Sequence, residues 1–259
     1  MLARITPLIL TLNEAPNIER TLNQLAWAQD IVVVDSCSTD GTRAILDRFP
    51  KVRVFERRFT THAEQWNFGL EQTGIRTEWV LALDADYVLS GGLAEEIAAI
   101  DEGLGSSGYR AGFVYCINGQ PLRGAAYPPV VVLYRRDGAR YLQDGHTQRL
   151  HVDGNVHDLR AKINQDDRKP LAQWLAAQAR YMRLEADKLI DTPVAALGAA
   201  DRLRRMIVVA PVAMFMFCLF ARGNVLNGRA GLFYALQRAT AEAILSLYLL
   251  QRKFFTDVR

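Results

Sequence analysis

The first ninety residues alternate between short apolar runs and segments with a helical pattern. The apolar runs are short and unbroken, as in buried strands, and cover residues 4–12, 31–34, 52–55 and 79–83. The segments between them predict helices over residues 16–28, 41–49 and 62–72. This alternation predicts an α/β fold with a mostly parallel sheet and helices on both faces. Ligands bind such sheets beyond the carboxyl ends of the strands.

Polar residues stand where three of these strands end. Residues 11–14 (TLNE) follow the first strand, and residues 35–42 (DSCSTDGT) follow the second. Turn chemistry explains residues 38–41 as a loop that leads into a helix. Asp35 is different, because it ends an apolar strand and needs a hydrogen-bond donor, which the base or ribose of a nucleotide would supply.

The fourth strand runs into Asp84-Ala85-Asp86. Side chains repeat their direction every second residue in a strand, so Asp84 and Asp86 are expected to point the same way. Two adjacent carboxylates repel each other, and burial strengthens the repulsion. A divalent cation such as Mg²⁺ or Mn²⁺, bound together with nucleotide phosphates, would relieve it. An acidic loop without a ligand is the simpler alternative.

Charge is unevenly distributed, although the formal net charge of the chain is only +3. From Arg202 onward, nine basic residues stand against two acidic ones, within runs of Met, Phe and Leu. This combination favours a membrane-facing segment over a nucleic-acid interface. The three cysteines are scattered, which indicates free thiols in a reducing cytoplasm, and the N-terminal apolar run is interpreted as a strand and not as a signal peptide.

Two apolar segments in the C-terminal part predict a pair of helices that lies in the membrane surface. Residues 206–221 are apolar throughout, but these sixteen residues are fewer than the roughly 20 of a spanning helix, and Pro211 is expected to kink them. Residues 230–250 are long enough, yet polar side chains recur at intervals of four, at Tyr234, Arg238, Glu242 and Ser246. Basic residues flank both segments and suit anionic headgroups. An apolar hairpin buried in a homo-oligomer interface is the alternative.

Four motifs in order carry a resemblance to a known family. They are LTLNEAPNIERTL, IVVVDSCSTDGT, EQWNFGL and WVLALDADYV, all within the first ninety residues. Together they resemble the family 2 glycosyltransferases of the GT-A fold, a three-layer α/β/α fold. Later stretches at 133–136, 144–150 and 166–189 resemble bacterial members that build lipopolysaccharide core, O-antigen or other lipid-linked glycans.

The resemblance implies a set of residues that bind a UDP-sugar. Thr11, Leu12 and Glu14 would line the uracil and ribose pocket, and Asp35 would accept a hydrogen bond from the uracil ring. Gln65 and Asn67 belong to the family's short motif beside the sugar nucleotide. In Asp84-Ala85-Asp86, Asp84 would contact ribose or the donor sugar, and Asp86 would bind the Mn²⁺ or Mg²⁺ that bridges the two phosphates.

The resemblance further implies an inverting reaction, in which a carboxylate accepts the proton of the attacking hydroxyl. Asp144 is the candidate base. Many relatives have a His-Glu pair near this position, whereas this chain has His146-Thr147, which leaves His146 as an alternative. His146 and Arg168 are candidates for contacting the acceptor or its phosphate.

These observations predict three regions. Residues 1–165 form a GT-A catalytic domain, residues 166–200 a helical extension, and residues 201–259 a basic, apolar hairpin on the membrane surface. The expected function is metal-dependent transfer of a hexose from a UDP-sugar to a hydroxyl of a lipid-linked glycan, with no nucleic-acid partner. The expected location is the cytoplasmic face of the inner membrane, peripheral or monotopic.

Two alternatives remain beside this function, and a third, a nucleotidyltransferase, is set aside. A polyprenyl-phosphate glycosyltransferase would use phosphate as the acceptor. A non-catalytic membrane adaptor would have no need of Asp84 and Asp86, and both are present. A nucleotidyltransferase would need a glycine-rich phosphate loop after the first strand, where this chain has TLNE.

Overall fold

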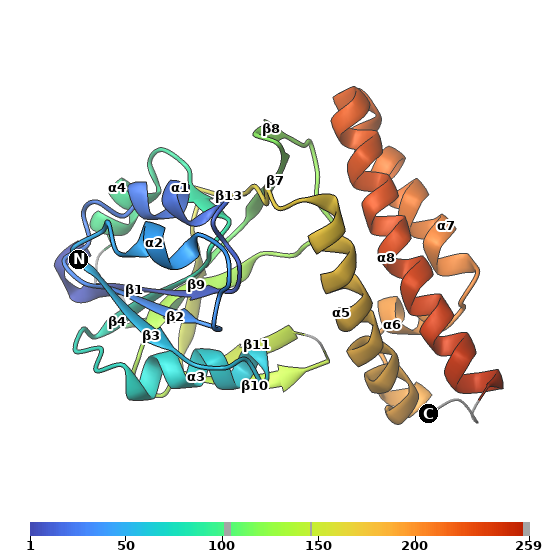
Figure 1. Cartoon of the computed structure of the whole chain (residues 1–259), viewed down its shortest axis with the longest axis horizontal. Coiled ribbons are helices and arrows are strands. Elements are labelled where there is room, and N and C mark those ends of the chain that lie inside the picture. Colours follow the sequence, from blue (N-terminus) through green and yellow to red (C-terminus); the bar gives the residue numbers. More distant parts are fainter. Residues whose placement is uncertain (101–104, 146, 256–259) are drawn as a thin grey trace. The chain divides into compact units, whose positions relative to one another are not determined.

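In a computed structural model of the chain, which describes residues 1–100, 105–145 and 147–255, the apolar runs form the strands of one large sheet (Figure 1). Seven strands pair in the order β12-β6-β9-β4-β1-β2-β3. Their bounds are β1 Ile5–Thr11, β2 Ile31–Asp35, β3 Val52–Glu56, β4 Trp79–Asp84, β6 Ser106–Ala111, β9 Val130–Arg135 and β12 Asn155–Asp158. The strands β3, β2, β1 and β4 run parallel, as the alternating pattern predicts, while β9 lies antiparallel between β4 and β6.

Helices cover both faces of this sheet, which confirms the predicted three-layer architecture. One face packs against α1 (Ile18–Asn23), α2 (Thr42–Leu46) and α4 (Leu93–Ala98). The other face packs against α3 (His62–Gln72). Successive residues of β4 divide between the two cores, because Leu81 and Leu83 belong to the first core and Val80 to the second.

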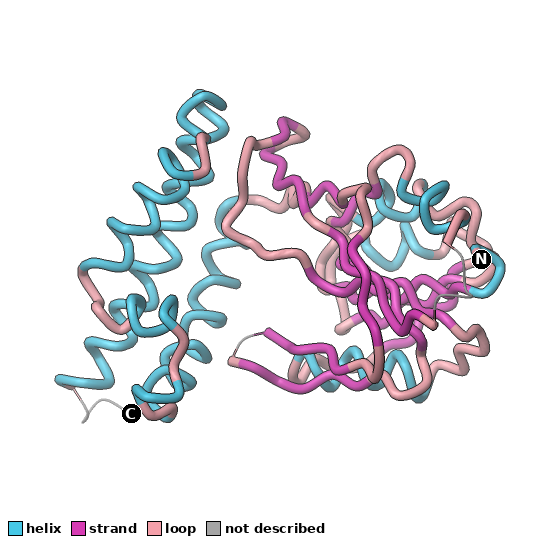
Figure 2. The backbone as a smooth tube through the Cα atoms, turned by 180° about the vertical axis from the view of Figure 1, so that it is seen from behind, coloured by secondary structure: helices cyan, strands magenta, loops and turns pink. Residues whose placement is uncertain are grey.

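Smaller strands lie outside the main sheet. Figure 2 shows them in magenta beside the main sheet. A four-stranded sheet has the order β5-β13-β7-β8, and β10 pairs with β11. Their bounds are β5 Tyr87–Leu89, β7 Phe113–Ile117, β8 Gln120–Pro121, β10 Arg140–Asp144, β11 Thr147–His151 and β13 Ile163–Gln165. β13 leads from this sheet into the polar segment 166–170, which becomes important at the candidate site.

Helix α3 spans the eleven residues expected for it, whereas α1 is shorter than predicted. The predicted helix covered residues 16–28, but the chain is helical only over Ile18–Asn23. On either side of the helix, hydrogen bonds between residues three apart replace the helical ones. Examples are the N–H of Asn17 to the carbonyl of Glu14 and the N–H of Leu25 to the carbonyl of Leu22. The apolar spacing continues through these turns, which is why the sequence suggested a longer helix.

The chain divides into two compact units, and the C-terminal helices form the second one. The first unit holds Met1–Pro121, Tyr127–Gln143 and Thr147–Arg168, and the second holds Leu122–Ala126, Asp144–His146 and Lys169–Arg259. The helices of the second unit are α5 Leu171–Asp191, η3 Val194–Ala196, α6 Ala199–Arg204, α7 Val209–Met216, η4 Phe217–Ala221, η5 Asn224–Asn227 and α8 Gly228–Phe254. The expected helical extension and the expected hairpin therefore pack within one unit.

No single helix of the described residues is long and apolar enough to cross a membrane, but α7–η4 and η5–α8, bent by 74°, meet the length and composition requirements as a pair. The expected kink at Pro211 is wrong. Because α7 begins at Val209, Pro211 lies in its first turn, where the missing N–H costs no intrahelical bond. The chain changes direction earlier, near Ile207, whose φ is +30°.

Candidate active site

Three parallel strands end side by side at one edge of the main sheet. In the strand register, Thr11 of β1 stands opposite Asp35 of β2, and Leu10 of β1 stands opposite Asp84 of β4. The structure thus brings together the polar strand ends that the sequence singled out. This edge is where an α/β sheet binds its ligand.

Asp35 is buried and accepts three hydrogen bonds from its neighbours. The hydroxyl of Thr11 donates to Oδ1 at 2.7 Å, and Ser38 donates its backbone N–H at 2.8 Å and its hydroxyl at 2.6 Å. Asp35 therefore does not need a ligand as donor, contrary to the expectation from the sequence, because its carboxylate closes the turn that follows β2. A role in nucleotide binding stays a prediction for this residue.

The loops after β1 and β2 are held together by side-chain to backbone hydrogen bonds. Asn13 has a left-handed backbone (φ +54°), which asparagine tolerates well, and its amide oxygen accepts the N–H of Thr39 at 2.8 Å. The N–H of Glu14 donates to the hydroxyl of Thr42 at 2.7 Å. Leu12 and Glu14 are half-buried, so the loop presents them from a preformed backbone.

Gln65 and Asn67 of α3 make hydrogen bonds with the loop after β2 and with β10, respectively. The amide of Gln65 is fully buried, donates to the hydroxyl of Ser36 at 2.9 Å and accepts from the guanidinium of Arg57. Asn67 exchanges two hydrogen bonds of 2.9 Å with the backbone of Tyr141 in β10. These contacts show Gln65 fixing the loop after β2 and Asn67 fixing β10, while direct contact with a sugar nucleotide stays a prediction.

The acidic triplet forms a turn, which differs from the extended backbone expected of it. β4 ends at Asp84, and Ala85 and Asp86 lie in the turn before β5. Strand alternation therefore does not govern the direction of Asp86. The turn is anchored because the hydroxyl of Thr21 in α1 donates to the carbonyl of buried Ala85 at 2.7 Å.

Both carboxylates of the triplet act on the Tyr87 hydroxyl. Desolvation by burial raises the pKa of Tyr87 well above its usual value, and the negative charges of Asp84 and Asp86 raise it further. Asp84 also accepts a hydrogen bond from this hydroxyl. Asp84 is thus hydrogen-bonded to this phenol, and the charge of Asp86 also acts on it.

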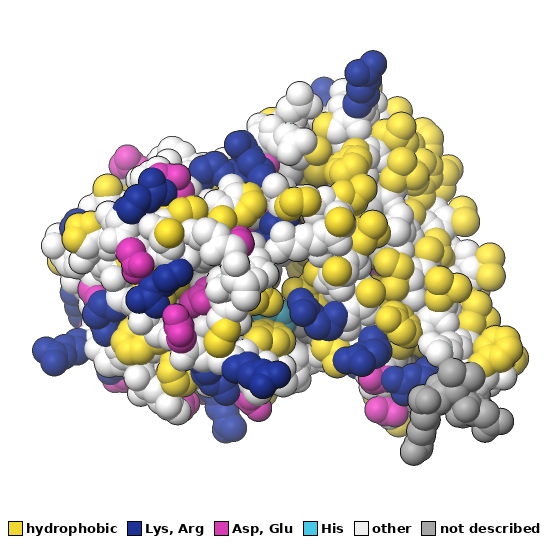
Figure 3. Space-filling model, viewed as in Figure 1, with side chains coloured by type: hydrophobic (Ala, Val, Ile, Leu, Met, Phe, Trp, Pro, Cys, Tyr) yellow, Lys and Arg dark blue, Asp and Glu magenta, His cyan; other side chains and the backbone are white. Residues whose placement is uncertain are grey.

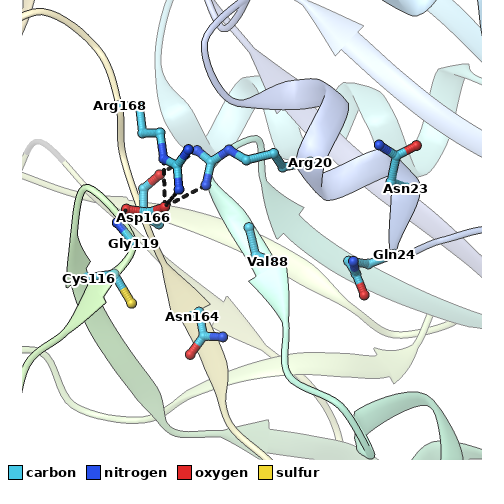
Figure 4. Close-up of a pocket in the computed structure, with 9 residues that line it drawn as sticks. All are labelled: Arg20, Asn23, Gln24, Val88, Cys116, Gly119, Asn164, Asp166 and Arg168. Carbon is cyan, nitrogen blue, oxygen red and sulfur yellow. Dashed lines mark hydrogen bonds and ion pairs between the residues drawn. The ribbon is translucent and has the colours of Figure 1, made fainter.

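A buried carboxylate that the sequence did not single out as a site residue, Asp166, organises the segment beside this turn. Its Oδ2 accepts from Arg20 at 2.6 Å and from Arg168 at 2.9 Å, and its Oδ1 accepts from the N–H of Gly119 at 2.9 Å. Figure 4 shows both guanidinium groups converging on this carboxylate. Its own N–H donates to the carbonyl of Asp86 at 3.1 Å. Asp166 therefore ties α1 and the β7–β8 turn to the acidic turn.

Arg168, a candidate contact for phosphate or acceptor, is one arm of this cluster and is partly exposed. A cavity of about 350 Å³ lies next to it, lined by Arg20, Asn164 and Cys116 among others (Figure 4). Burial, reinforced by the charge of Asp166, raises the pKa of the Cys116 thiol to about 11, so the thiol is protonated at neutral pH. The only signal for Asp166 in the sequence is that it stands two residues before Arg168, a candidate acceptor contact.

We expect the replacement Asp166→Ala to lower the free energy of unfolding by about 3 kcal/mol, because it leaves two guanidinium groups without their common partner. Urea denaturation followed by circular dichroism measures the change. Asp158→Ala is the matched control, since Asp158 pairs with Arg110 at an exposed position and its loss should change stability little. Equal effects of the two substitutions would contradict the structural role of Asp166.

Asp144, the candidate base, is the last residue of β10 and belongs to the second unit, called the helical unit below. Its Oδ1 lies 2.9 Å from the ammonium of Lys188 in α5. Burial acts to lower the pKa of Lys188, but the hydrogen bond to Asp144 and the charges of Glu185 and Asp201 outweigh it, so the pKa is raised. His146, the alternative base and candidate acceptor contact, lies outside the described residues.

The sequence model of glycosyl transferase family 2 matches residues 8–151, which is more than half of the chain. The chain belongs to glycosyl transferase family 2. The match includes the C-terminal half of β1 and all of β2 and β4, with their polar ends, together with Asp144. The expected family is thereby confirmed, and the protein is a glycosyltransferase.

Relatives and structures agree with this assignment. The chain is 27% identical to the lipopolysaccharide core biosynthesis glycosyltransferase LpsC of Rhizobium meliloti (strain 1021), over 96% of this chain and 92% of LpsC. It is 36% identical to an uncharacterized glycosyltransferase of Rickettsia bellii (strain RML369-C), over 38% of this chain and 32% of that protein. Its fold is similar to S. aureus TarS 1–349 in complex with UDP-GlcNAc, with a TM-score of 0.51 and 15% identity, over 97% of this chain and 91% of that one. The GT-A fold is confirmed.

Members of this family commonly use a divalent metal ion, so the fit of such an ion matters. Among residues 1–100, 105–145 and 147–255, no group of three or more His, Cys, Asp and Glu side chains is arranged to hold a metal. Mg²⁺, however, is usually bound by one or two carboxylates together with substrate phosphates and water. Asp84 and Asp86, which both act on the Tyr87 hydroxyl, fit that mode because the donor's phosphates would supply the remaining ligands.

Proposed function

We propose that this family 2 glycosyltransferase is an inverting, metal-dependent enzyme that moves a hexose from a UDP-sugar to a hydroxyl group of a lipid-linked glycan. The observation that carries the proposal is the convergence of Thr11, Asp35 and the Asp84–Asp86 turn at one edge of the sheet. The likeness to LpsC over nearly the whole chain supports an acceptor of the lipopolysaccharide type.

Uridine recognition is assigned to the loops after β1 and β2. Thr11, Leu12, Glu14 and Asp35 stand on a backbone that is held before any ligand arrives, which reduces the entropy lost on binding. The complex of TarS with UDP-GlcNAc, a protein of similar fold, supports the donor class.

Asp86, with Asp84 beside it, would hold Mn²⁺ or Mg²⁺. Such an ion would stabilise the negative charge that develops on the diphosphate as the sugar leaves. Asp84 is placed by its hydrogen bond with Tyr87 and by the end of β4, and it is assigned to ribose or the donor sugar.

Asp144 is proposed to accept the proton of the acceptor hydroxyl. As that proton moves to the carboxylate, the hydroxyl oxygen bonds to C1 of the sugar, the bond from C1 to the diphosphate breaks, and UDP leaves. Attack from the face opposite UDP inverts the anomeric centre. Arg168 and His146 are the candidates for holding the acceptor or its phosphate.

The helical unit buries several polar side chains of α8 beside its apolar core and exposes many large apolar side chains. Tyr234, Glu242 and Ser246, three of the four residues in the polar stripe of α8, are buried. Their polar atoms bond within the unit, as where the Tyr234 hydroxyl accepts from the N–H of Ala126 and the Ser246 hydroxyl donates to the carbonyl of Ile207. Soluble helices normally show the reverse pattern.

The exposed apolar side chains of this unit support a position in a membrane surface, which we propose to be the cytoplasmic face of the inner membrane. Six of the most exposed are Val208, Val212, Phe220, Leu226, Leu236 and Leu247. Figure 3 shows hydrophobic side chains gathered over the helical unit. Exposed basic residues near them, Arg222, Arg229 and Lys253, suit anionic headgroups. A homo-oligomer that covers this surface is the alternative.

We expect the full-length protein to float with vesicles that contain anionic lipid, and the double substitution Val212→Asp, Leu226→Asp to leave most of it unbound. Two carboxylates on this surface would have to enter the headgroup region. Leu142→Asp is the matched control, because Leu142 is an exposed leucine of β10 in the first unit. A protein that stays in solution as a tight dimer without detergent would contradict the membrane proposal.

The function itself is tested with purified protein, a set of UDP-sugars and lipid-linked acceptors, using mass spectrometry of the product. A mass increase of one hexose on a glycolipid hydroxyl supports the proposal. Transfer to polyprenyl phosphate would instead identify a polyprenyl-phosphate glycosyltransferase. Calorimetry with UDP, with and without Mn²⁺, separates both from a non-catalytic adaptor, which would show no metal-dependent binding.

A further inference from the structure

The turn that carries Asp144 rests on a network of charged side chains inside the helical unit. Lys188 of α5 contacts Asp144 at 2.9 Å and Asp201 of α6 at 3.7 Å. Beside it, Arg204 of α6 pairs with Glu185 of α5 at 2.9 Å and with Glu242 of α8 at 3.1 Å. These two groups of ion pairs connect three helices with the end of β10.

The Glu185–Arg204–Glu242 part of the network is deeply buried. The side chains of Glu185 and Glu242 are 2% and 4% exposed, and that of Arg204 is 18% exposed. Burial acts to lower the pKa of Arg204, but the charges of Glu242 and Glu185 outweigh it and raise the pKa. Because Glu185 and Lys188 stand three residues apart on α5, they share one helix face. The buried triad therefore fixes the part of α5 from which Lys188 projects.

Gly145 shows how closely the turn rests on this network. A Cβ atom at this position would lie 2.1 Å from Oε1 of Glu185 and 3.0 Å from Cδ of Lys188. Its φ of +61° is also a conformation that favours glycine. The chain therefore passes over α5 with no room for a side chain immediately after Asp144.

We propose that Lys188 is a positioning residue that holds the Asp144 carboxylate in the orientation needed to accept the proton of the acceptor hydroxyl. This inference rests on the proposed function, in which Asp144 is the base. The distance of 2.9 Å is that of a charge-assisted hydrogen bond, and both side chains are largely withdrawn from solvent. The proton still passes from the acceptor hydroxyl to Asp144, and Lys188 neither gives nor takes one.

A fixed ammonium has two physical effects on such a base. It restricts the rotation of a carboxylate that stands at a strand end, so this side chain loses less rotational freedom when the acceptor binds. It also offsets the electrostatic repulsion between the Asp144 carboxylate and an incoming diphosphate or anionic acceptor. Without Lys188, the base would be present but poorly oriented.

The test compares Lys188→Met with Lys188→Arg in the full-length protein. We expect Lys188→Met to lower kcat for sugar transfer by about 10²-fold, with the KM for the UDP-sugar and the binding of UDP unchanged. Lys188→Arg restores a cation at a similar distance and should recover most of kcat. Asp201→Asn removes the more distant partner of Lys188 and should change kcat by no more than about twofold.

A double-mutant cycle separates positioning of the base from a general loss of structure. If Lys188 acts through Asp144, adding Lys188→Met to Asp144→Asn should lower kcat little further. If the two substitutions lower kcat independently, so that their factors multiply in the double variant, the inference is overturned while Asp144 remains the base. Normal transfer by Lys188→Met would have the same consequence. Normal transfer by Asp144→Asn would overturn both the base assignment and this inference.

Discussion

Replacing Asp86 with alanine should abolish sugar transfer. If Asp86 holds the metal ion, its loss removes the stabilisation of the leaving diphosphate, which contributes several kcal/mol, or at least about 10³-fold in rate. The structure gives a reason to expect little damage to the fold. The turn is anchored through backbone carbonyls, where Ala85 accepts from Thr21 and Asp86 from the N–H of Asp166, and these remain in the variant.

The measurement is the initial rate of transfer for wild type and Asp86→Ala, with Mn²⁺ titrated from zero. EDTA should silence the wild type, and Mn²⁺ or Mg²⁺ should restore it. Asp153→Ala is a suitable control, because Asp153 is exposed and lies 3.1 Å from the exposed imidazole of His151. Full activity of the wild type in EDTA would disprove metal dependence.

The second large effect is expected for Asp144→Asn. Asparagine keeps the shape of the side chain but cannot accept the proton of the acceptor hydroxyl, so transfer should fall by roughly 10²-fold or more. Binding of UDP-sugar should persist, because the residues assigned to uridine are on the loops after β1 and β2. Calorimetry for donor binding and mass spectrometry for transfer measure the two properties separately.

The outcome also decides between the two candidates for the base. If Asp144→Asn transfers normally and His146→Ala does not, the base is His146 or another carboxylate. If both variants are slow but only Asp144→Asn binds donor normally, Asp144 is the base and His146 contributes to binding. Comparison of thermal unfolding guards against a trivial loss of fold.

Much of the catalytic unit was predictable from local patterns. The helix over residues 62–72 and the strand that begins at Trp79 follow from the spacing of apolar residues, since each conformation presents a different period to a core. The polar strand ends were also predictable as one group, because parallel neighbours end at the same edge. The family followed from the order of four motifs.

The partners of individual polar side chains were not predictable in this way. Asp35 seemed to lack a donor, yet Thr11 is its neighbour in the next strand and Ser38 closes its turn. Asp166 was not a candidate site residue in the sequence, yet it pairs with Arg20, a residue 146 positions away. A hydrogen bond depends on distance in space, and no period along the chain reports that distance.

The C-terminal part shows the same division. The sequence by itself determined that α8 carries a polar stripe on an apolar helix, because residues at intervals of four share a face. Only the tertiary structure decided that this stripe faces inward, where Glu242 meets Arg204, and that the adjoining α5 brings Lys188 to Asp144. The physical reason is that local periodicity defines which residues share a surface, whereas packing between distant segments selects which surface is buried.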